Sequence, residues 1–374
     1  MRSPVDYSER RTRVVHLIGG VHSATALLVT NPANVRWLTG LASSNAAILL
    51  RADVTILVTD SRYRDPALAV PGVQLVIARD VARQAIVAGL TAAASVAGAA
   101  AGESAVAFES DSLSAAEHQR LESDPDFTAV TFIPTAGLVA QLRTIKEPAE
   151  IELIRQACEI STAALRALVD QVRVGMSEVT IARTLEYELA AHGADDRAFP
   201  TIAAAGPNTA TPHHQPTHRP VGRGEVLKID FGAMVQGYHA DCTRCFVVGA
   251  QPSDRHTEIH QLVHQGAAAG RDALVAGVTI ADVDLSARSV IAGRGFGEYF
   301  SHGLGHGIGL EIHEPPLLSG ATGGTLARGN VVTIEPGVYL PDEFGIRIED
   351  TCVVTDGSAE VLTDFPRELT VIDG

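Results

Sequence analysis

Residues 228–244, KIDFGAMVQGYHADCTR, set two aspartates in an apolar segment that has the pattern of a β-hairpin. VLKIDFGA precedes the predicted turn and YHADCTRCFVV follows it, and the midpoint between Asp230 and Asp241 falls within AMVQG. This spacing predicts that the two aspartates face each other across the hairpin, with side chains about 5 Å apart. Like charges in that position are destabilising, and acids are rare in apolar surroundings unless they are paired or bind a cation.

A second segment, TIEPGVYLPDEFGIRIED at residues 333–350, repeats the pattern with two glutamates. Glu335 and Glu349 are centred on position 342, inside the predicted turn PDEF, so they too should face each other. With His306 of HGLGHGIG, the set holds four carboxylates and one imidazole, an oxygen-rich and fairly hard combination. In both hairpins the opposed carboxylates would repel each other, so both need a compensating positive charge. We therefore predict a site for two divalent metal ions. Its expected ligands are Asp230, Asp241, His306, Glu335 and Glu349.

A pair of predicted helices precedes each hairpin. The first pair begins at Pro148 and near Ser177, and Thr279 caps the second helix of the later pair. The first carboxylates of the two hairpins lie 105 positions apart, and the second ones lie 108 apart. Residues 145–374 are therefore predicted to form an α+β domain with an internal pseudo-two-fold duplication, whose halves face each other across the metal site.

Residues 1–139 are predicted to form a separate α/β domain. Six strand-like runs, ATALLVT, AAILLR, DVTILVT, VQLVIA, AVAFES and AVTFI, alternate with helical or alanine-rich stretches. We expect DVARQAIVAGLTAAASVAG to form a surface helix. Trp37, beside Arg36 in the loop NPANVRWLTG, is expected to be a packing residue. A linker near TAGLVAQLRTIKEP separates the two domains.

Composition excludes several classes of partner. A formal net charge of −15 disfavours nucleic acid and anionic membranes. No segment has the roughly 18 consecutive apolar residues of a membrane span, and no apolar signal region follows the charged start. Four cysteines in 374 residues do not indicate a disulfide framework, so we expect a cytoplasmic protein. Cys242 and Cys245 fall on opposite faces of a predicted strand and should bind no zinc.

The motifs DFGA, DCTR, GLGHGIGLEIHE, TIEPG and RIED, in this order, resemble the peptidase family that contains Xaa-Pro dipeptidase (prolidase), Xaa-Pro aminopeptidase and methionine aminopeptidase. The resemblance is close from about residue 145 to 374, and it implies the pita-bread catalytic fold. The N-terminal part is similar to the creatinase/prolidase N-domain. By position, Asp230, Asp241, His306, Glu335 and Glu349 match the family's five metal ligands.

The resemblance also implies roles for neighbouring residues. His213, His302 and His313 match histidines that surround the substrate, and Glu335 matches the group that moves a proton from water to the leaving nitrogen. His213 and His313 are expected to stabilise the oxyanion, and His302 to contact the leaving side. Thr243 is expected to hydrogen-bond a ligand carboxylate. For the substrate carboxylate, the expected partners are His302, Arg347 and Arg36. The two metal ions are expected to be manganese, with cobalt, iron or zinc as alternatives.

Four functions are compatible with this resemblance. The preferred one is an Xaa-Pro dipeptidase that releases proline from a small peptide with proline at the second position. An Xaa-Pro aminopeptidase acting on longer peptides is the alternative. A metal-free creatinase-type hydrolase and a non-catalytic protein-binding module are more remote, because their known examples have lost ligands that this chain keeps. Relatives with this N-domain are commonly homodimers, so a homodimer is expected here.

Overall fold

The computed structural model describes residues 5–20, 24–97 and 104–373, and the chain divides into two compact units, Met1–Arg143 and Thr144–Gly374. Each unit has its own hydrophobic core. Within the described ranges, none of the helices combines the length and apolarity needed to cross a membrane.

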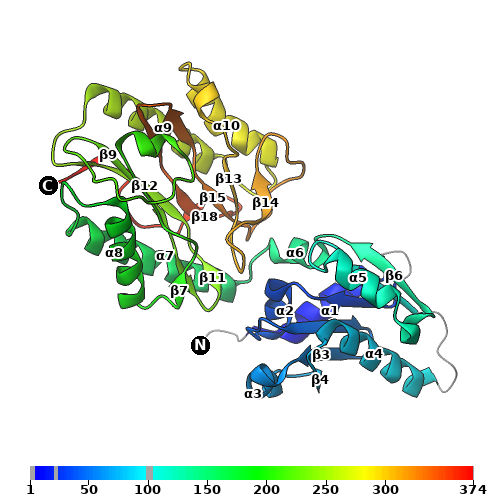
Figure 1. Cartoon of the computed structure of the whole chain (residues 1–374). Coiled ribbons are helices and arrows are strands. Elements are labelled where there is room, and N and C mark those ends of the chain that lie inside the picture. The colour runs from blue at the N-terminus through cyan, green and yellow to red at the C-terminus, as the bar shows by residue number, and fades with distance from the viewer. Residues whose placement is uncertain (1–4, 21–23, 98–103, 374) are drawn as a thin grey trace. The chain divides into compact units, whose positions relative to one another are not determined.

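The first unit is built on a six-stranded mixed sheet with the order β4-β3-β2-β1-β5-β6 (Figure 1). All six predicted strand runs form strands. They are β1 (Ala26–Val29), β2 (Ala46–Arg51), β3 (Thr55–Thr59), β4 (Gln74–Ile77), β5 (Ser104–Glu109) and β6 (Val130–Thr135). The helices are α1 (Tyr7–Ile18), α2 (Pro32–Thr39), α3 (Arg64–Leu68), α4 (Val81–Ala97), α5 (Ala115–Glu122) and α6 (Leu138–Arg143), with short 3₁₀ turns at Ser61–Tyr63 and Pro125–Phe127.

Two features of this unit refine the sequence predictions. The alanine-rich helix α4 packs on strands β2 and β3 and buries Ala82, Ala85 and Ile86, so it covers the sheet. A side chain at Gly89 would overlap Leu49, which explains a glycine inside this helix. Trp37 is 1 % exposed, and the guanidinium of Arg10 lies 4.7 Å from its ring centre, which confirms a packing role.

The second unit consists of two halves, each a helix pair packed on a sheet (Figure 1). In the first half, α7 (Pro148–Val169) and α8 (Glu178–Ala191) contact the sheet β20-β12-β9-β8 and the small sheet β11-β10-β7. In the second, α9 (Asp254–Asp272) and α10 (Ile280–Ala292) contact the sheet β14-β13-β15-β18-β19 and the ribbon β16-β17. The helix pairs thus flank the strands, as the internal duplication predicts.

The strands of the second unit follow the chain in this order. The first half has β7 (Asp196–Arg197), β8 (Ile202–Ala205), the 3₁₀ turn η3 (Gly206–Ala210), β9 (Val226–Phe231), β10 (Ala233–Val235), β11 (Tyr238–His239) and β12 (Cys242–Val248). The second half has the turn η4 (Gly297–Tyr299), β13 (Gly305–Gly307), β14 (Glu314–Leu318), β15 (Val331–Ile334), β16 (Gly337–Leu340), β17 (Phe344–Arg347), β18 (Asp350–Val353) and β19 (Glu360–Val361). The last strand, β20 (Thr370–Ile372), returns to the first half and pairs with β12.

The register of the later hairpin agrees with the prediction. Gly337 pairs with Arg347 in the β16-β17 ribbon, and Ile334 pairs with Asp350 in β15-β18. Both pairs are centred on position 342, so the register places Glu335 opposite Glu349 where the ribbon meets the sheet. The predicted turn is therefore correct.

The register of the first hairpin differs from the prediction by one position at the turn. Asp230 pairs with Thr243, so the prediction that Asp230 and Asp241 lie directly opposite each other was wrong. The turn residues are Gln236 and Gly237, both with positive φ, which is the two-residue hairpin turn that matches strand twist. Asp241 therefore lies diagonally across from Asp230 on the same face, still within the range of neighbouring side chains.

A buried ion cluster next to the second hairpin ties the two halves together. Asp350, which is fully buried, accepts hydrogen bonds from Arg244 at 2.8 Å, Arg271 at 3.0 Å and Arg367 at 2.6 Å. Arg244 lies on β12 of the first half and also donates to the backbone carbonyl of Glu349 at 2.5 Å. Burial raises the pKa of Asp350, but the charges of Arg244 and Arg367 outweigh it and hold that pKa below its usual value.

We expect Asp350→Asn to destabilise the second unit by roughly 3–5 kcal/mol, because three arginines would lose their buried counter-charge. A carboxylate with a lowered folded-state pKa stabilises the protein above its unfolded pKa, about 3.9, and this contribution disappears as the pH falls through the folded value. Calorimetry of the full chain near pH 7 should show the loss as a lower Tm. An unchanged Tm would show that the arginines find other partners.

Candidate metal centre and substrate pocket

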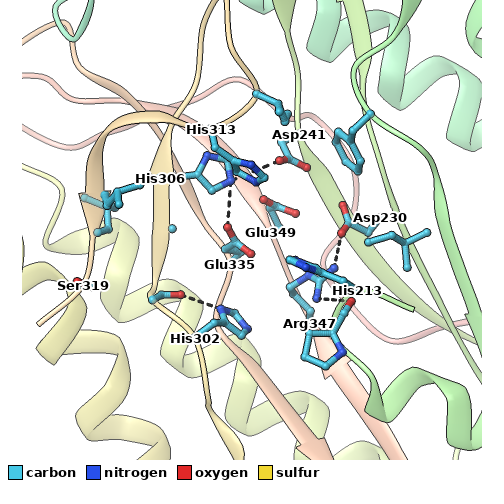
Figure 2. A pocket seen from close by; sticks show the side chains of 18 residues that line it. His213, Asp230, Asp241, His302, His306, His313, Ser319, Glu335, Arg347 and Glu349 are labelled. Carbon is cyan, nitrogen blue, oxygen red and sulfur yellow. Dashed lines mark hydrogen bonds and ion pairs between the residues drawn. The ribbon is translucent and has the colours of Figure 1, made fainter. Parts of the chain in front are cut away.

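The five predicted ligands line one cavity of the second unit, of about 470 Å³ (Figure 2). They come from both halves: Asp230 from β9, Asp241 from the residue before β12, His306 from β13, Glu335 from the residue after β15, and Glu349 from the residue before β18. At strand ends and bulges the regular pairing of strands is interrupted, so side chains there can converge more closely than in a continuous sheet. The fold thus brings together residues separated by more than a hundred positions.

His306 presents one nitrogen to the carboxylates. Its Nδ1 lies 3.0 Å from the carbonyl oxygen of Gly307, so Nδ1 carries the proton that this hydrogen bond needs. The other nitrogen, Nε2, lies 3.3 Å from Glu335 and 3.6 Å from Asp241. This is the ring orientation that a metal-ligating histidine takes when a backbone carbonyl holds its second nitrogen.

The donor atoms fit a divalent cation. Ligand atoms of Asp241, His306 and Glu349 all lie within 4.8 Å of one another. Among the residues that the structure describes, Oδ1 of Asp230 and Oδ1 of Asp241 are buried without a hydrogen-bond partner. Buried polar atoms of this kind call for a partner, and carboxylate oxygens next to an imidazole suit a divalent metal ion.

The electrostatics lead to the same conclusion. Burial, followed by the charge of Glu349, raises the pKa of Asp241 well above its usual value. Burial and the charge of Glu335 similarly raise the pKa of Glu349. Carboxylates this crowded repel each other, and a bound cation would reverse the effect by favouring their ionised forms.

Glu335 differs from the other carboxylates in its contacts. It accepts a hydrogen bond from Thr333 at 3.1 Å and pairs with His306. Burial raises its pKa, but the interaction with His306 and the positive charge of Arg347 outweigh burial and lower the pKa to about 2. Glu335 is therefore an ionised carboxylate that faces the cavity.

Thr243 and Arg347 orient two of the predicted ligands. The Thr243 hydroxyl donates to Glu349 at 2.6 Å and accepts from Nε of Arg347 at 3.0 Å. Arg347 also forms an ion pair with Asp230 and donates to the Tyr339 hydroxyl at 2.8 Å and the Pro212 carbonyl at 3.3 Å. The expected contact of Thr243 with a ligand carboxylate is therefore present.

The contacts of Arg347 favour a different role from the predicted one. Four of its N–H groups donate to protein atoms, and its side chain is 2 % exposed. It is therefore better placed to orient Asp230 than to bind a substrate carboxylate. Arg36 lies on helix α2 of the first unit, and its contact with substrate stays a prediction.

The three predicted substrate histidines, His213, His302 and His313, all line the cavity (Figure 2). The ring of His313 packs edge-on against His306, with ring centres 4.3 Å apart. Burial lowers the pKa of His313, and burial also lowers that of His302. Both rings are therefore neutral near pH 7, and His313 can offer a ring nitrogen to substrate as a hydrogen-bond partner.

Tyr339 is a site residue that the sequence analysis missed. Its hydroxyl accepts a hydrogen bond from Arg347, so its own proton is left for Nε2 of His302, at 2.9 Å. Nδ1 of His302 then donates to the carbonyl of Gly303 at 2.8 Å, which fixes the ring. Alternation along the strand from Glu335 through Gly337 places Tyr339 on the same face, and this signal could have identified it.

Comparison with known protein families identifies both units. Residues 152–356 match the model of metallopeptidase family M24, and residues 11–145 match that of the creatinase/prolidase N-terminal domain. The chain is 34 % identical to the uncharacterized peptidase YqhT of Bacillus subtilis over 350 residues, which cover 92 % of this chain and 95 % of that protein.

Two solved structures are similar over nearly the whole chain. One is an Xaa-Pro dipeptidase from Bacillus anthracis, with a TM-score of 0.90, 32 % identity and coverage of 98 % of this chain and 100 % of the other. The other is an X-Pro aminopeptidase from Thermotoga maritima, with a TM-score of 0.85, 35 % identity and coverage of 97 % and 99 %.

The fold and the family matches define an enzyme of the metallopeptidase class, with the pita-bread catalytic fold behind a creatinase-type N-terminal domain. The chain belongs to metallopeptidase family M24. Membership in this family implies divalent metal ions, and the ligand cluster described above is where the structure can hold them.

Proposed function

We propose that the chain hydrolyses the bond between an N-terminal residue and proline, with Xaa-Pro dipeptides, cleaved to free proline, as its preferred substrates. The observation that carries the proposal is one cavity that joins five metal-ligand candidates, three histidines and an apolar wall. The wall consists of Phe199, Ile202, Ile312, Leu317 and Leu318. It offers an apolar surface to the proline ring, and a cavity of about 470 Å³ suits a small ligand.

The proposed mechanism assigns a task to each group. Metal ions held by Asp230, Asp241, His306, Glu335 and Glu349 would supply Lewis acidity, which acidifies a water molecule and polarises a carbonyl oxygen. Glu335, as an ionised carboxylate in the cavity, can accept the proton of the attacking water. It can then pass that proton to the proline nitrogen, which has no hydrogen of its own in the peptide and needs one to leave as an amine.

The histidines complete the proposed mechanism. His213 and His313 can donate hydrogen bonds to the carbonyl oxygen as negative charge develops on it. His302 is fixed by Tyr339 and Gly303 and lines the cavity, where it would contact the leaving proline. The apolar wall of the cavity strengthens these contacts because water competes less for them there.

Substrate length distinguishes the two candidate activities. A site that binds the proline carboxylate of Ala-Pro should lose about 1–3 kcal/mol with Ala-Pro-Ala, which offers a neutral amide there. We therefore expect kcat/KM to be about 10-fold higher for Ala-Pro than for Ala-Pro-Ala. A preference for the tripeptide would make the chain an Xaa-Pro aminopeptidase. The engagement of Arg347 by Asp230 supports that alternative, because this guanidinium is not free for a substrate carboxylate.

Three further properties belong to the same proposal. Manganese is the proposed native metal, since four carboxylates and one imidazole make a hard site, with cobalt, iron and zinc as alternatives. A homodimer and a cytoplasmic location are proposed as well. Metal analysis of the purified protein, sedimentation velocity and fractionation of its natural cell would test the three properties in turn.

A further inference from the structure

The loop that carries His213 lies between β8 and β9 and is held by two buried charged side chains. Apart from the turn η3, residues 206–225 form no helix or strand. Backbone hydrogen bonds hold the later part of the loop, residues 217–221, to residues 175–179, but this part lies beyond His213 along the chain. His213 nevertheless faces the cavity, so other contacts must set its position.

Lys228 is the first of these two side chains, and it binds the backbone of the loop. It lies on β9, is fully buried, and its Nζ donates to the backbone carbonyls of Thr209 at 3.0 Å, Thr211 at 2.8 Å and Pro212 at 3.2 Å. An ammonium group has three donors, and all three are directed at the four residues that precede His213. A lysine is rarely buried in this way without compensating contacts.

Glu178 holds the same loop from the side of helix α8. It is fully buried and accepts hydrogen bonds from Ala205 N at 2.8 Å, from Asn208 at 2.9 Å and from Thr217, whose N lies at 2.9 Å and whose hydroxyl lies at 2.7 Å. The ring of His214 contributes its Nε2 at 2.9 Å. The donors come from both sides of His213 along the chain.

The loop also rests on the strand that carries Arg347. The backbone N–H of Gly345 donates to the Thr209 hydroxyl at 2.8 Å, and a side chain at Gly345 would overlap the Thr209 carbonyl. Arg347 donates to the Pro212 carbonyl. The loop is therefore fixed against β9, which bears Asp230, and against β17, which ends two residues before Glu349.

We propose that Lys228 and Glu178 are positioning residues that fix His213 at the cavity. This inference rests on the proposed role of His213 in hydrolysis. A side chain that stabilises an oxyanion must be held close to its working position, and a displacement of about 1 Å can cost on the order of 100-fold in rate. Two buried side chains that direct their hydrogen bonds to this one loop meet that requirement.

The test is a double-mutant cycle between Lys228→Met and His213→Ala on the manganese-loaded full chain, with Ala-Pro as substrate. Lys228→Met keeps the length of the side chain and removes its three donors. Alone it should lower kcat by about 10- to 100-fold with a smaller change in KM. In the His213→Ala background the same change should cost less than about 3-fold, because a positioning residue has no effect when the group it positions is gone.

Hydrogen–deuterium exchange supplies a readout that does not depend on activity. Lys228→Met should raise exchange in peptides covering residues 205–217, while bound manganese, measured by mass spectrometry, stays at the wild-type level. Leu189→Ala is the matched control. Leu189 is buried on the same helix as Glu178, about 16 Å further along, so it should lower stability without raising exchange in 205–217.

Additive effects of the two substitutions, or unchanged exchange in residues 205–217, would overturn the proposal. If His213→Ala retained full kcat/KM, the proposed role of His213 would fail, and the exchange data would still decide whether Lys228 fixes the loop. If Lys228→Met failed to fold, His214→Ala would replace it. That variant removes one donor to Glu178 and should lower kcat about 3- to 10-fold, again only when His213 is present.

Discussion

Chelation should abolish Ala-Pro hydrolysis, and added Mn²⁺ should restore it. The cavity gathers four carboxylates and the Nε2 of His306, and two of the carboxylate oxygens are buried without a hydrogen-bond partner among the described residues. Without divalent cations these groups repel one another and the cavity lacks a Lewis acid for the carbonyl. Proline release, followed before chelation, after chelation and after metal addition, measures the effect.

Circular dichroism and a thermal scan serve as the control for this experiment. Both should show that the chelated protein keeps its fold, since the hydrophobic cores of the second unit do not depend on the metal ligands. A chelated protein that is shown to be free of metal and still turns over at the original rate would contradict the metallopeptidase mechanism. Loss of the fold on chelation would show instead that the metals are structural.

Glu335→Gln should reduce kcat by at least about 10²–10⁴-fold, the usual contribution of general acid–base catalysis. The substitution removes the carboxylate that we propose both binds metal and moves the proton, so weaker metal binding should add to the loss. Glutamine has nearly the same shape and can still accept a hydrogen bond from Thr333, so the fold should survive. Steady-state kinetics together with titration calorimetry of Mn²⁺ would separate the two effects.

Glu343→Gln is a matched control for this variant. Glu343 lies in the turn between β16 and β17 and is exposed, and its ion pair with Arg255 is a long surface contact of 3.9 Å. Surface pairs of this kind contribute little, so kinetics and metal binding should stay at the wild-type values. A Glu335→Gln variant as active as the Glu343→Gln variant would remove Glu335 from the mechanism.

The elements of this fold could be predicted where hydrophobic pattern and turn chemistry agree. The hairpin around position 342 has apolar strands and a loop that is symmetric about its carboxylates, and its register was correct. In the earlier hairpin, the midpoint between the two aspartates predicted a turn one position earlier than the turn that the pair Gln236–Gly237 indicates. The backbone followed the turn residues, because a two-residue turn with positive φ matches the twist of the strands.

Helix α1 was missed although its start is visible in the sequence. Asp6 caps the helix by accepting from the backbone of Ser8 and Glu9, and a short acidic residue before a helical run is a known start signal. The helix buries Arg10 and Arg11, whose guanidinium groups donate to the backbone carbonyls of Trp37 and Leu38. These contacts join residues far apart in sequence. Because two of the buried residues are charged, the segment does not show the apolar pattern by which helices are predicted.

The ligand set and its partner Thr243 could be predicted, whereas Lys228 and Glu178, which hold the loop of His213, could not. Acids in apolar runs are conspicuous, and all five candidates line the same cavity. Lys228 and Glu178 act through partners that only the tertiary structure brings close, such as the carbonyl of Pro212 and the side chain of His214. Spacing in the sequence contains no record of such contacts.

Anomalous diffraction at the manganese edge, from crystals of the manganese-loaded chain, tests the central claim most directly. The account predicts two peaks per chain, both in contact with members of the set Asp230, Asp241, His306, Glu335 and Glu349. A single peak, or peaks bound elsewhere with these five side chains free of metal, would contradict it.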